Sequence, residues 1–584
     1  MRFSLYMVLI FCGLLTVNIG NMSAQSAFIS VDESFEDWSE GLSTYEDVTN
    51  DAPQNDLLKI QASNDADYLF IRFELDTEID LTGDFSPHDL SLHFDTDNNA
   101  QTGSSYGSNF GAELSIYFID RTARYFAVNN NTYVSTEALG MRVAPTVSSK
   151  EFELAIRRDA IPVEDYPLFT NNSIRIMLQE NTFGDWMPGM GEEAFEYTFD
   201  ESPVEQPAPI SFGKESAGAI RVLAYNILWD ALDDPDRRNY IRQIVQATDP
   251  DIIAFSEATT TSWESAKQML DFWQPLGTPQ GWYVERDDYD LITASRWPIV
   301  EEYKQQERFY PTLIDLPENY GSDLLLTNGH LKCCDADEIR QDQVDQYLAF
   351  ILDAKTEGGI IDVPENTPFM IVGDLNLVTD GQHLRSLLDG TIVNTDLYGQ
   401  GAPLDWDNTD LADEVCLHSD DQRFSYSWYD VGSSFPPGRI DMHIYSDAVM
   451  SIEKSFTINT SIMSPERLNQ LGLSAQTTAL ASDHYPVVAD YLLNAYEPVG
   501  LVEVATPSGF EIRQADGRSV LWNTGDSGSV YSATIYSVSG QVVASFRSSE
   551  ESKEIDFSGL GYGVYLLRVE SADQRSVAMF KLVH

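Results

Sequence analysis

Basic residues are scarce in this 584-residue chain. It has 35 Lys and Arg against 93 Asp and Glu, which gives a formal net charge of −58. Because Lys and Arg supply most of the affinity that proteins have for nucleic acids, this balance argues against tight, unaided binding to a polyanion. Local basic patches or bound divalent cations would have to offset it. A broad acidic surface instead predicts a well-solvated protein.

Cysteine is also rare, and long apolar runs are missing beyond the N-terminus. Four cysteines are too few for a disulfide framework. A bridge from Cys333 or Cys334 to Cys416, and three unpaired thiols, both remain open. Residues 1–26 combine a basic start, an apolar run and small residues at the end, which predicts a secretory signal peptide. No later segment is apolar over the roughly 20 residues that a membrane-spanning helix needs.

Residues 27–200 alternate apolar and polar positions in short runs, such as "DYLFIRFEL" and "LSLHFDTD". This pattern, with turn residues between the runs, predicts a β-sandwich. Together with "FEDWSE" these stretches resemble the family 9 carbohydrate-binding modules, which implies a polysaccharide partner. The loop "DTDNNAQTG" places Asp95, Asp97 and Asn99 at alternate positions, as oxygen ligands of Ca²⁺ would be. A polar turn whose side chains cap their own backbone explains the loop equally well.

Two further segments flank or follow the central part of the chain. Residues 201–217 are rich in Pro, Ser and Glu, which predicts a linker. Residues 501–584 read as strands, and "ATIYSVSGQVV", "IDFSGLGYGVYLLRVE" and "VAMFKLVH" resemble the C-terminal sorting domain of the type IX secretion system. The resemblance implies export to the cell surface or exterior, with the type IX machinery as partner. An ordinary small β-sandwich domain is the alternative.

Residues 218–495 mix strand-like and helical patterns. "IRVLAYNIL" and "DIIAFSEA" read as strands, whereas "EIRQDQVDQYLAFILDAK" has one apolar stripe at helical spacing. The mixture predicts a layered α/β domain, the part of the chain best suited to hold an active site.

Polar residues stand at the ends of several predicted strands in this domain. "FMIVGDLNL" ends in Asp374 and Asn376, which strand alternation would place on one face, and Gly373 would allow a close backbone approach. Similar stretches contribute Asn226, Glu257, His330, Asp441, Asp483 and His484. Each residue alone has a plain structural explanation, such as a turn or a solvated strand end. The whole set, at strand ends of one domain, predicts a shared site.

The order of these residues resembles the endonuclease/exonuclease/phosphatase superfamily, the deoxyribonuclease I-like proteins. The resemblance covers residues 218–495 and includes "ITASRWPI". It implies a four-layered α/β sandwich, with two β-sheets between helices. This central domain would be flanked by the N-terminal β-sandwich and a small C-terminal one.

The resemblance also implies roles for single residues. Asn226, Glu257 and Asp483 would hold Mg²⁺, or Mn²⁺, through oxygen atoms. His484 would be the general base, oriented by Asp441. The remaining residues would act on the substrate: Asp374 and Asn376 on the water and the phosphate, and His330 on the leaving group. Leu228 stands where some members have Asp, so the number of metal ions stays open.

The leading hypothesis is therefore a secreted, Mg²⁺-dependent phosphoesterase, most simply a phosphodiesterase of the nuclease type. Phosphorylated glycans, lipids or small organic phosphates are alternative substrates. A different hypothesis is a surface carbohydrate-binding protein whose α/β domain is inactive. The complete set of site residues argues against that hypothesis.

Overall fold

The computed structural model describes residues 27–495 and seven strands between residues 511 and 583. Gaps in this description before residue 495 fall at 82–88, 108, 128–129, 147, 305, 335, 378–380 and 434. The expected signal peptide, residues 1–26, lies outside the described residues. The chain forms two compact units, of which the second comprises Tyr496–His584 and the short stretch Glu318–Gly321. None of the described helices is long and apolar enough to cross a membrane.

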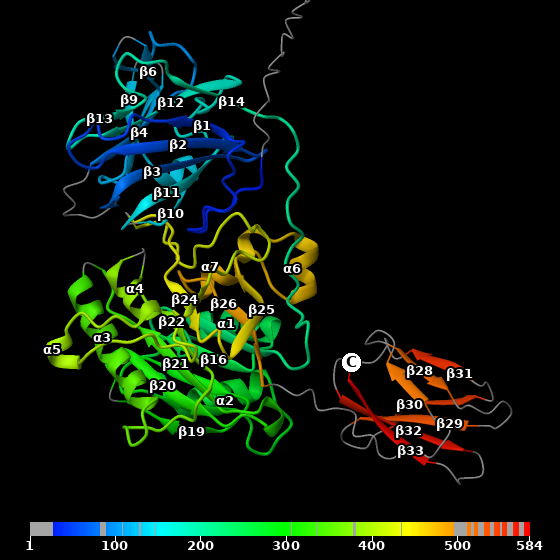
Figure 1. The fold of residues 1–584 in the computed structure, drawn as a ribbon. Coiled ribbons are helices and arrows are strands. Elements are labelled where there is room, and N and C mark those ends of the chain that lie inside the picture. The colour runs from blue at the N-terminus through cyan, green and yellow to red at the C-terminus, as the bar shows by residue number, and fades with distance from the viewer. Residues whose placement is uncertain are drawn as a thin grey trace, which may run out of the picture. The chain divides into compact units, whose positions relative to one another are not determined.

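The N-terminal domain is a β-sandwich, as predicted (Figure 1). One sheet has the order β1 (Ser43–Glu46), β2 (Leu57–Asn64), β3 (Tyr68–Asp80), β11 (Ser148–Arg157), β10 (Arg142–Ala144). The other has the order β13 (Asp185–Met187), β12 (Ser173–Glu180), β4 (Leu90–Asp95), β7 (Leu114–Tyr117), β8 (Thr122–Ala127), β9 (Asn130–Ser135), with β14 (Phe195–Thr198) also on β12. A separate hairpin joins β5 (Ser104–Tyr106) and β6 (Phe110–Ala112). Alternate residues such as Ile71 and Phe73 point into one shared core.

The central domain contains two six-stranded sheets. The first has the order β17 (Tyr283–Arg286), β18 (Ile292–Ser295), β16 (Ile252–Ser256), β15 (Ile220–Asn226), β26 (Val487–Leu493), β25 (Met450–Thr457). The second has the order β19 (Ile299–Glu302), β20 (Phe309–Ile314), β21 (Leu324–His330), β22 (Phe369–Asp374), β24 (Asp441–Tyr445), β23 (Ala412–Glu414). The sheets are joined by Asn328 of β21, whose side-chain amide donates to Phe255 O of β16 at 2.9 Å.

Helices cover the outer faces of both sheets (Figure 1). On the first sheet lie α1 (Pro235–Thr248), α2 (Trp263–Trp273), α6 (Pro465–Leu471) and α7 (Thr477–Ala481). On the second lie α3 (Asp337–Ala354) and α4 (Gln382–Asp389), followed by the short α5 (Thr395–Tyr398). The apolar stripe of α3, including Val344, Leu348 and Ile351, packs on β22 residues such as Ile371. The domain is the expected four-layered α/β sandwich.

The second unit also consists of β-sheets. Its strands are β27 (Glu511–Gln514), β28 (Ser519–Asn523) and β31 (Ser552–Asp556) in one sheet, and β30 (Val542–Ser548), β29 (Tyr531–Ser537), β32 (Val564–Ser571) and β33 (Val577–Val583) in another. The prediction that residues 501–584 form short strands is therefore confirmed.

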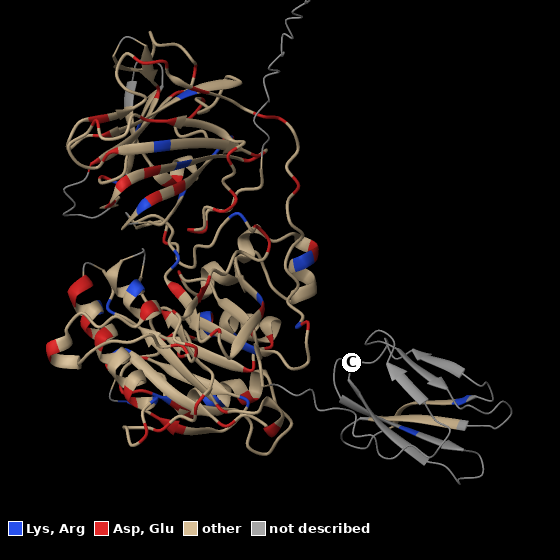
Figure 2. Cartoon of the chain, viewed as in Figure 1, with Lys and Arg blue, Asp and Glu red and all other residues tan. Residues whose placement is uncertain are grey.

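The sandwich and the central domain are packed directly against each other. Val31, Trp38 and Phe70 of the sandwich form one apolar cluster with Phe424 of the central domain. Residues 201–217, between the two domains, also pack on the central domain. The Phe212 ring stacks on that of Phe456 in β25, with centroids 4.7 Å apart. Acidic residues are spread along both domains, and basic residues are few (Figure 2).

All three cysteines in the described part of the chain are free thiols. Cys416 is buried, whereas Cys334 is exposed and Cys333 lies between these extremes. Of the two alternatives that the sequence left open, the structure has the unpaired thiols.

Candidate active site

Three of the predicted residues lie side by side on neighbouring strands. His330 ends β21, Asp374 ends β22, and Asp441 begins β24. The strand register pairs His330 with Asp374, and Asp374 with Asp441. Because β21 and β22 are parallel, their carboxyl ends meet at the same edge, where α/β sheets bind ligands. Strand register therefore assembles the centre of the site.

A glycine brings these strands close together. Gly373 has φ +127°, and a Cβ atom there would lie 2.3 Å from the carbonyl oxygen of Gly329 on β21. Any larger side chain would push the two strands apart. The close backbone approach that the sequence predicted at Gly373 is thus confirmed.

Asn376 reaches the site differently from the prediction. The strand ends at Asp374, and Asn376 has φ +51°, so strand alternation does not apply to it. Its backbone N–H donates to Asp374 Oδ1 at 3.0 Å, and its side-chain amide donates to Leu331 O at 3.1 Å. Asn376 therefore lies beside Asp374 because a turn folds it back.

Asp374 lies between two His–Asp pairs. His484 Nδ1 is 2.8 Å from Asp441 Oδ2, and His330 Nδ1 is 2.8 Å from Asp290 Oδ2. The Nε2 atoms of both histidines are 3.7 Å from Asp374 Oδ2. All five side chains are largely buried. Each histidine is thus held by a carboxylate on one side and faces Asp374 with the other.

The carboxylates determine the protonation of His484. Burial alone would lower the pKa of His484, but Asp441 and Asp374 outweigh it and raise the pKa to about 10. Burial raises the pKa of the Asp374 carboxyl. At neutral pH the chain by itself therefore keeps His484 protonated, and a further positive charge near Asp374 would favour the neutral imidazole.

Asn226 joins two carboxylates at the end of β15. Its side-chain amide donates to Asp374 Oδ2 at 2.8 Å and to Glu257 Oε1 at 3.0 Å. Its Oδ1 accepts the backbone N–H of Leu228 at 2.9 Å. Asn226 therefore holds Glu257 and Asp374 together and is itself fixed in orientation.

Glu257, His330 and Asp374 form a group suited to a metal ion. One ligand atom from each lies within 4.8 Å of the others. Glu257 follows β16 in a left-handed conformation, φ +59°, which turns its side chain into this group. Two carboxylates with amide and imidazole neighbours are ligands that Mg²⁺ or Mn²⁺ accepts. The residues present thus fit a divalent cation.

Asp483 is placed slightly apart from that group of three. Its Oδ2 accepts the indole N–H of Trp428 at 3.0 Å, and its Oδ1 lies 3.4 Å from Ser482 Oγ. The next residue is His484, so Asp483 still lies at the same edge of the sheets.

Sequence reasoning missed Asp290 and Ser427. Asp290 lies two residues before β18, so a search for acids close to strand ends would have included it. Ser427 donates to Asp441 Oδ2 at 2.8 Å and accepts the backbone N–H of Asp441 at 2.8 Å. No local pattern marks Ser427, because its partner is 14 residues away on another element.

The predicted calcium loop of the sandwich brings Asp95 and Asp97 together with a third carboxylate. Asp95, Asp97 and Glu113 place ligand atoms within 4.8 Å of one another. Asn99 contacts this group, because its backbone N–H donates to Asp95 Oδ1 at 2.8 Å, and its Oδ1 accepts the N–H of Gln101 at 3.2 Å. Glu113, which the sequence did not suggest, is 8% exposed, and its Oε1 has no hydrogen-bond partner.

Two segments of the chain match family models. Residues 223–484 match the endonuclease/exonuclease/phosphatase family, and residues 520–583 match the secretion system C-terminal sorting domain. No curated protein sequence matches the chain.

Several solved structures are weakly similar. An endonuclease/exonuclease/phosphatase from Beutenbergia cavernae is 16% identical, with 63% of this chain and 100% of that chain covered and a TM-score of 0.29. TDP2 of D. rerio complexed with a single-stranded DNA product is 15% identical, with 47% and 98% covered and a TM-score of 0.30. Sphingomyelinase C from Streptomyces griseocarneus is 17% identical, with 47% and 99% covered and a TM-score of 0.27.

Proposed function

Because residues 223–484 form a domain of the endonuclease/exonuclease/phosphatase family, we propose that this phosphoric ester hydrolase is a divalent-cation-dependent phosphodiesterase of the nuclease type. The sorting domain indicates secretion to the cell surface or exterior. One observation carries the proposal: Asp374 lies between two His–Asp pairs and shares Asn226 with Glu257.

The chain's own residues supply proton transfer and orientation. His484 accepts a proton from the attacking water at Nε2, while Asp441 holds Nδ1 and fixes the tautomer. Asp374 faces that Nε2 atom and orients the water. His330, held by Asp290, donates a proton to the leaving oxygen or stabilises its charge. Asn376 contributes an amide beside Asp374 for the phosphoryl oxygens.

Glu257 and Asp374 would hold the cation through carboxylate oxygens, with Asn226 keeping the two carboxylates in place. When bound, a Mg²⁺ or Mn²⁺ ion would neutralise charge on the phosphoryl oxygens and offset the carboxylates that keep His484 protonated. A need for a bound cation agrees with the scarcity of basic side chains in the whole protein.

The test uses full-length protein with bis(p-nitrophenyl) phosphate and with plasmid DNA. We expect hydrolysis with Mg²⁺, none with EDTA, and a loss of at least about 100-fold in kcat for Asp374→Asn. His383→Ala on α4 is the control, because it removes a mostly buried histidine that has no role in the proposal. Activity that survives EDTA, or an active Asp374→Asn variant, would refute the proposal. A folded but inactive wild type would favour the carbohydrate-binding alternative.

A cavity favours phosphorylated glycans as a second candidate substrate. It measures about 530 Å³, lies between the sandwich and the central domain, and is lined by Tyr68, Tyr426, Tyr429 and Tyr485 among others. Aromatic rings and a few polar groups suit a sugar, and Tyr485 directly follows His484. If a glycan is the substrate, Tyr426→Ala should raise KM for a phosphodiester-linked oligosaccharide without changing KM for bis(p-nitrophenyl) phosphate.

We also propose that Asp95, Asp97 and Glu113 bind Ca²⁺ in the sandwich. Three carboxylates converge there, and the buried Glu113 Oε1 has no other partner. Ca²⁺ accepts more oxygen ligands and less regular geometry than Mg²⁺. Calorimetry with the full-length protein should detect Ca²⁺ binding that Glu113→Gln abolishes. Binding that is unchanged in this variant would exclude the site.

A further inference from the structure

We propose that the N-terminal sandwich positions the catalytic pair Asp441–His484 through the segment of residues 423–429. The sandwich would then be a working part of the active site and not an attached module. This inference rests on the role proposed for that pair.

The first half of the segment is bound by the sandwich. Val31 lies alongside Phe424 as a parallel bridge, and its N–H donates to Arg423 O at 2.7 Å. Ser425 Oγ donates to Val31 O at 3.3 Å. The Arg423 guanidinium forms a buried ion pair with Asp65, with Nη1 and Oδ2 2.7 Å apart. These contacts fix both the backbone and the side chains of this half.

The second half of the segment holds the catalytic pair. Ser427 Oγ donates to Asp441 Oδ2, the same oxygen that lies 2.8 Å from His484 Nδ1. Ser427 O accepts the N–H of Tyr485 at 2.6 Å, and Trp428 forms a bridge opposite His484. Only a few residues thus separate the contacts with the sandwich from those with the catalytic pair.

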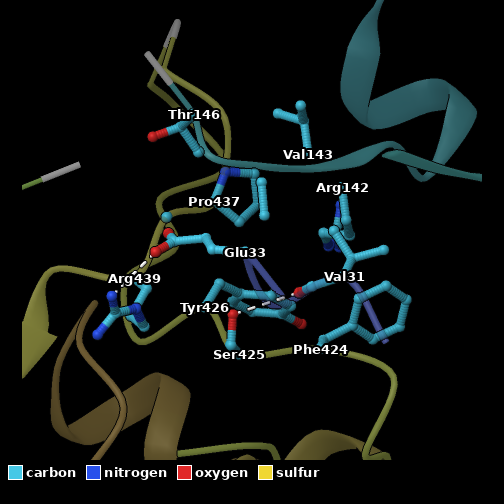
Figure 3. Close-up of a pocket in the computed structure, with 12 residues that line it drawn as sticks. Val31, Glu33, Arg142, Val143, Thr146, Phe424, Ser425, Tyr426, Pro437 and Arg439 are labelled. Atoms are coloured by element: carbon cyan, nitrogen blue, oxygen red, sulfur yellow. Dashed lines mark hydrogen bonds and ion pairs between the residues drawn. The ribbon is translucent and has the colours of Figure 1, made fainter. Parts of the chain in front are cut away.

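A second connection leads to Asp441 along the chain. Arg439, two residues before Asp441, is buried and pairs with Glu33 of the sandwich at 2.9 Å and with Asp413 of β23 at 2.8 Å. Figure 3 shows the Glu33 carboxylate facing Arg439, and Ser425 facing Val31. Glu33 is held in turn, because its N–H donates to Glu153 Oε1 at 2.9 Å.

The burial of these charges makes the arrangement rigid. A buried guanidinium needs its carboxylate partners, because an unpaired charge away from water is strongly unfavourable. Arg439 and Arg423 therefore hold the two stretches that lead to Asp441 and Ser427 against the sandwich. A displacement of about 1 Å at a reacting group can cost about 100-fold in rate.

The test compares two single variants of full-length protein with bis(p-nitrophenyl) phosphate. Glu33→Gln removes the charge that pairs with Arg439. Glu78→Gln is the matched control, because Glu78 also forms an ion pair across the domains, with Arg385. Both of these side chains are 42% exposed, and both residues lie outside the stretch 423–439. We expect Glu33→Gln to lower kcat about tenfold at unchanged KM, and Glu78→Gln to change neither by more than about twofold.

A double-mutant cycle separates positioning from a general loss of stability. If Glu33 acts through Asp441, the effects of Glu33→Gln and Ser427→Ala on kcat should be less than additive, whereas those of Glu78→Gln and Ser427→Ala should add. If Glu33→Gln fails to fold, Ser425→Ala replaces it, because it removes only the hydrogen bond to Val31. Wild-type kcat in the folded variant, or fully additive effects, would overturn the inference.

A failure of the positioning role can be told apart from a failure of the proposed function. An active His484→Ala variant would refute the proposed function itself. An inactive His484→Ala variant beside a fully active Glu33→Gln variant would refute only the positioning role of the sandwich.

Discussion

His484 Nδ1 lies 2.8 Å from Asp441 Oδ2, and this carboxylate is buried. In Asp441→Asn the amide no longer stabilises a charged imidazole, and it would donate to Nδ1 and so select the wrong tautomer. We expect kcat to fall by about 100-fold or more while the melting temperature changes little. Steady-state kinetics with bis(p-nitrophenyl) phosphate will measure this, and near-wild-type turnover would remove Asp441 from the mechanism.

Asp290 should matter less than Asp441. It holds His330 in the same geometry, but on the side proposed for the leaving group. We expect Asp290→Asn to lower kcat about tenfold with bis(p-nitrophenyl) phosphate. The loss should be larger for substrates whose leaving group is a poor one, because these need more help from His330. An equal loss for good and poor leaving groups would contradict this role.

Glu257→Gln keeps the shape of the side chain but removes one charge from the group of possible metal ligands. The Mg²⁺ concentration for half-maximal activity should rise by at least about tenfold. Replacing a residue that only orients a metal ligand already lowers metal affinity by about that factor. A Mg²⁺ titration of kcat measures this directly. The same Mg²⁺ dependence in variant and wild type would place the cation elsewhere.

Buried histidines predict acid sensitivity of the fold. Burial lowers the pKa of His443 on β24, and of His418 in the same domain, to about 4. In the unfolded chain an imidazole takes up a proton below about pH 6.5, so each histidine destabilises the fold as the pH falls from 6.5 to 4. The loss is at most about 1.4 kcal/mol per pH unit and histidine.

His443→Gln tests this prediction, because it removes one of these titrating groups. Between pH 6.5 and 4 the free energy of unfolding of the variant should fall less steeply than that of the wild type. Above pH 7 the two slopes should agree. Equal slopes over the whole range would show that His443 does not titrate as its burial predicts.

The C-terminal unit should be needed for export and not for hydrolysis. Every proposed catalytic residue lies before residue 495, whereas the sorting-domain match lies at residues 520–583. A chain that ends at residue 495 should keep its kcat and KM on soluble substrates. In a host with a type IX secretion system it should remain cell-associated and fail to reach the surface. Reduced kcat in the purified shortened protein would disprove this separation.

Much of this protein was predictable because the informative patterns are local. Alternation of apolar residues indicated the two β-rich parts, and the apolar stripe of α3 indicated its packing. Asp374 and His330 stood out because each ends an apolar strand with a polar side chain. Strand ends are short-range features, so a single sequence contains them in full.

The tertiary structure decided which of these residues meet. The register of β21, β22 and β24 puts His330, Asp374 and Asp441 in one row, and no local pattern encodes a register between distant strands. Asp290 and His330 are 40 residues apart, and Glu33 and Arg439 are 406 apart. Such pairs form because packing the sheets and domains buries charges that then require partners. The sequence by itself therefore determined the elements and most candidate residues, whereas packing determined their partners and joined the sandwich to the active site.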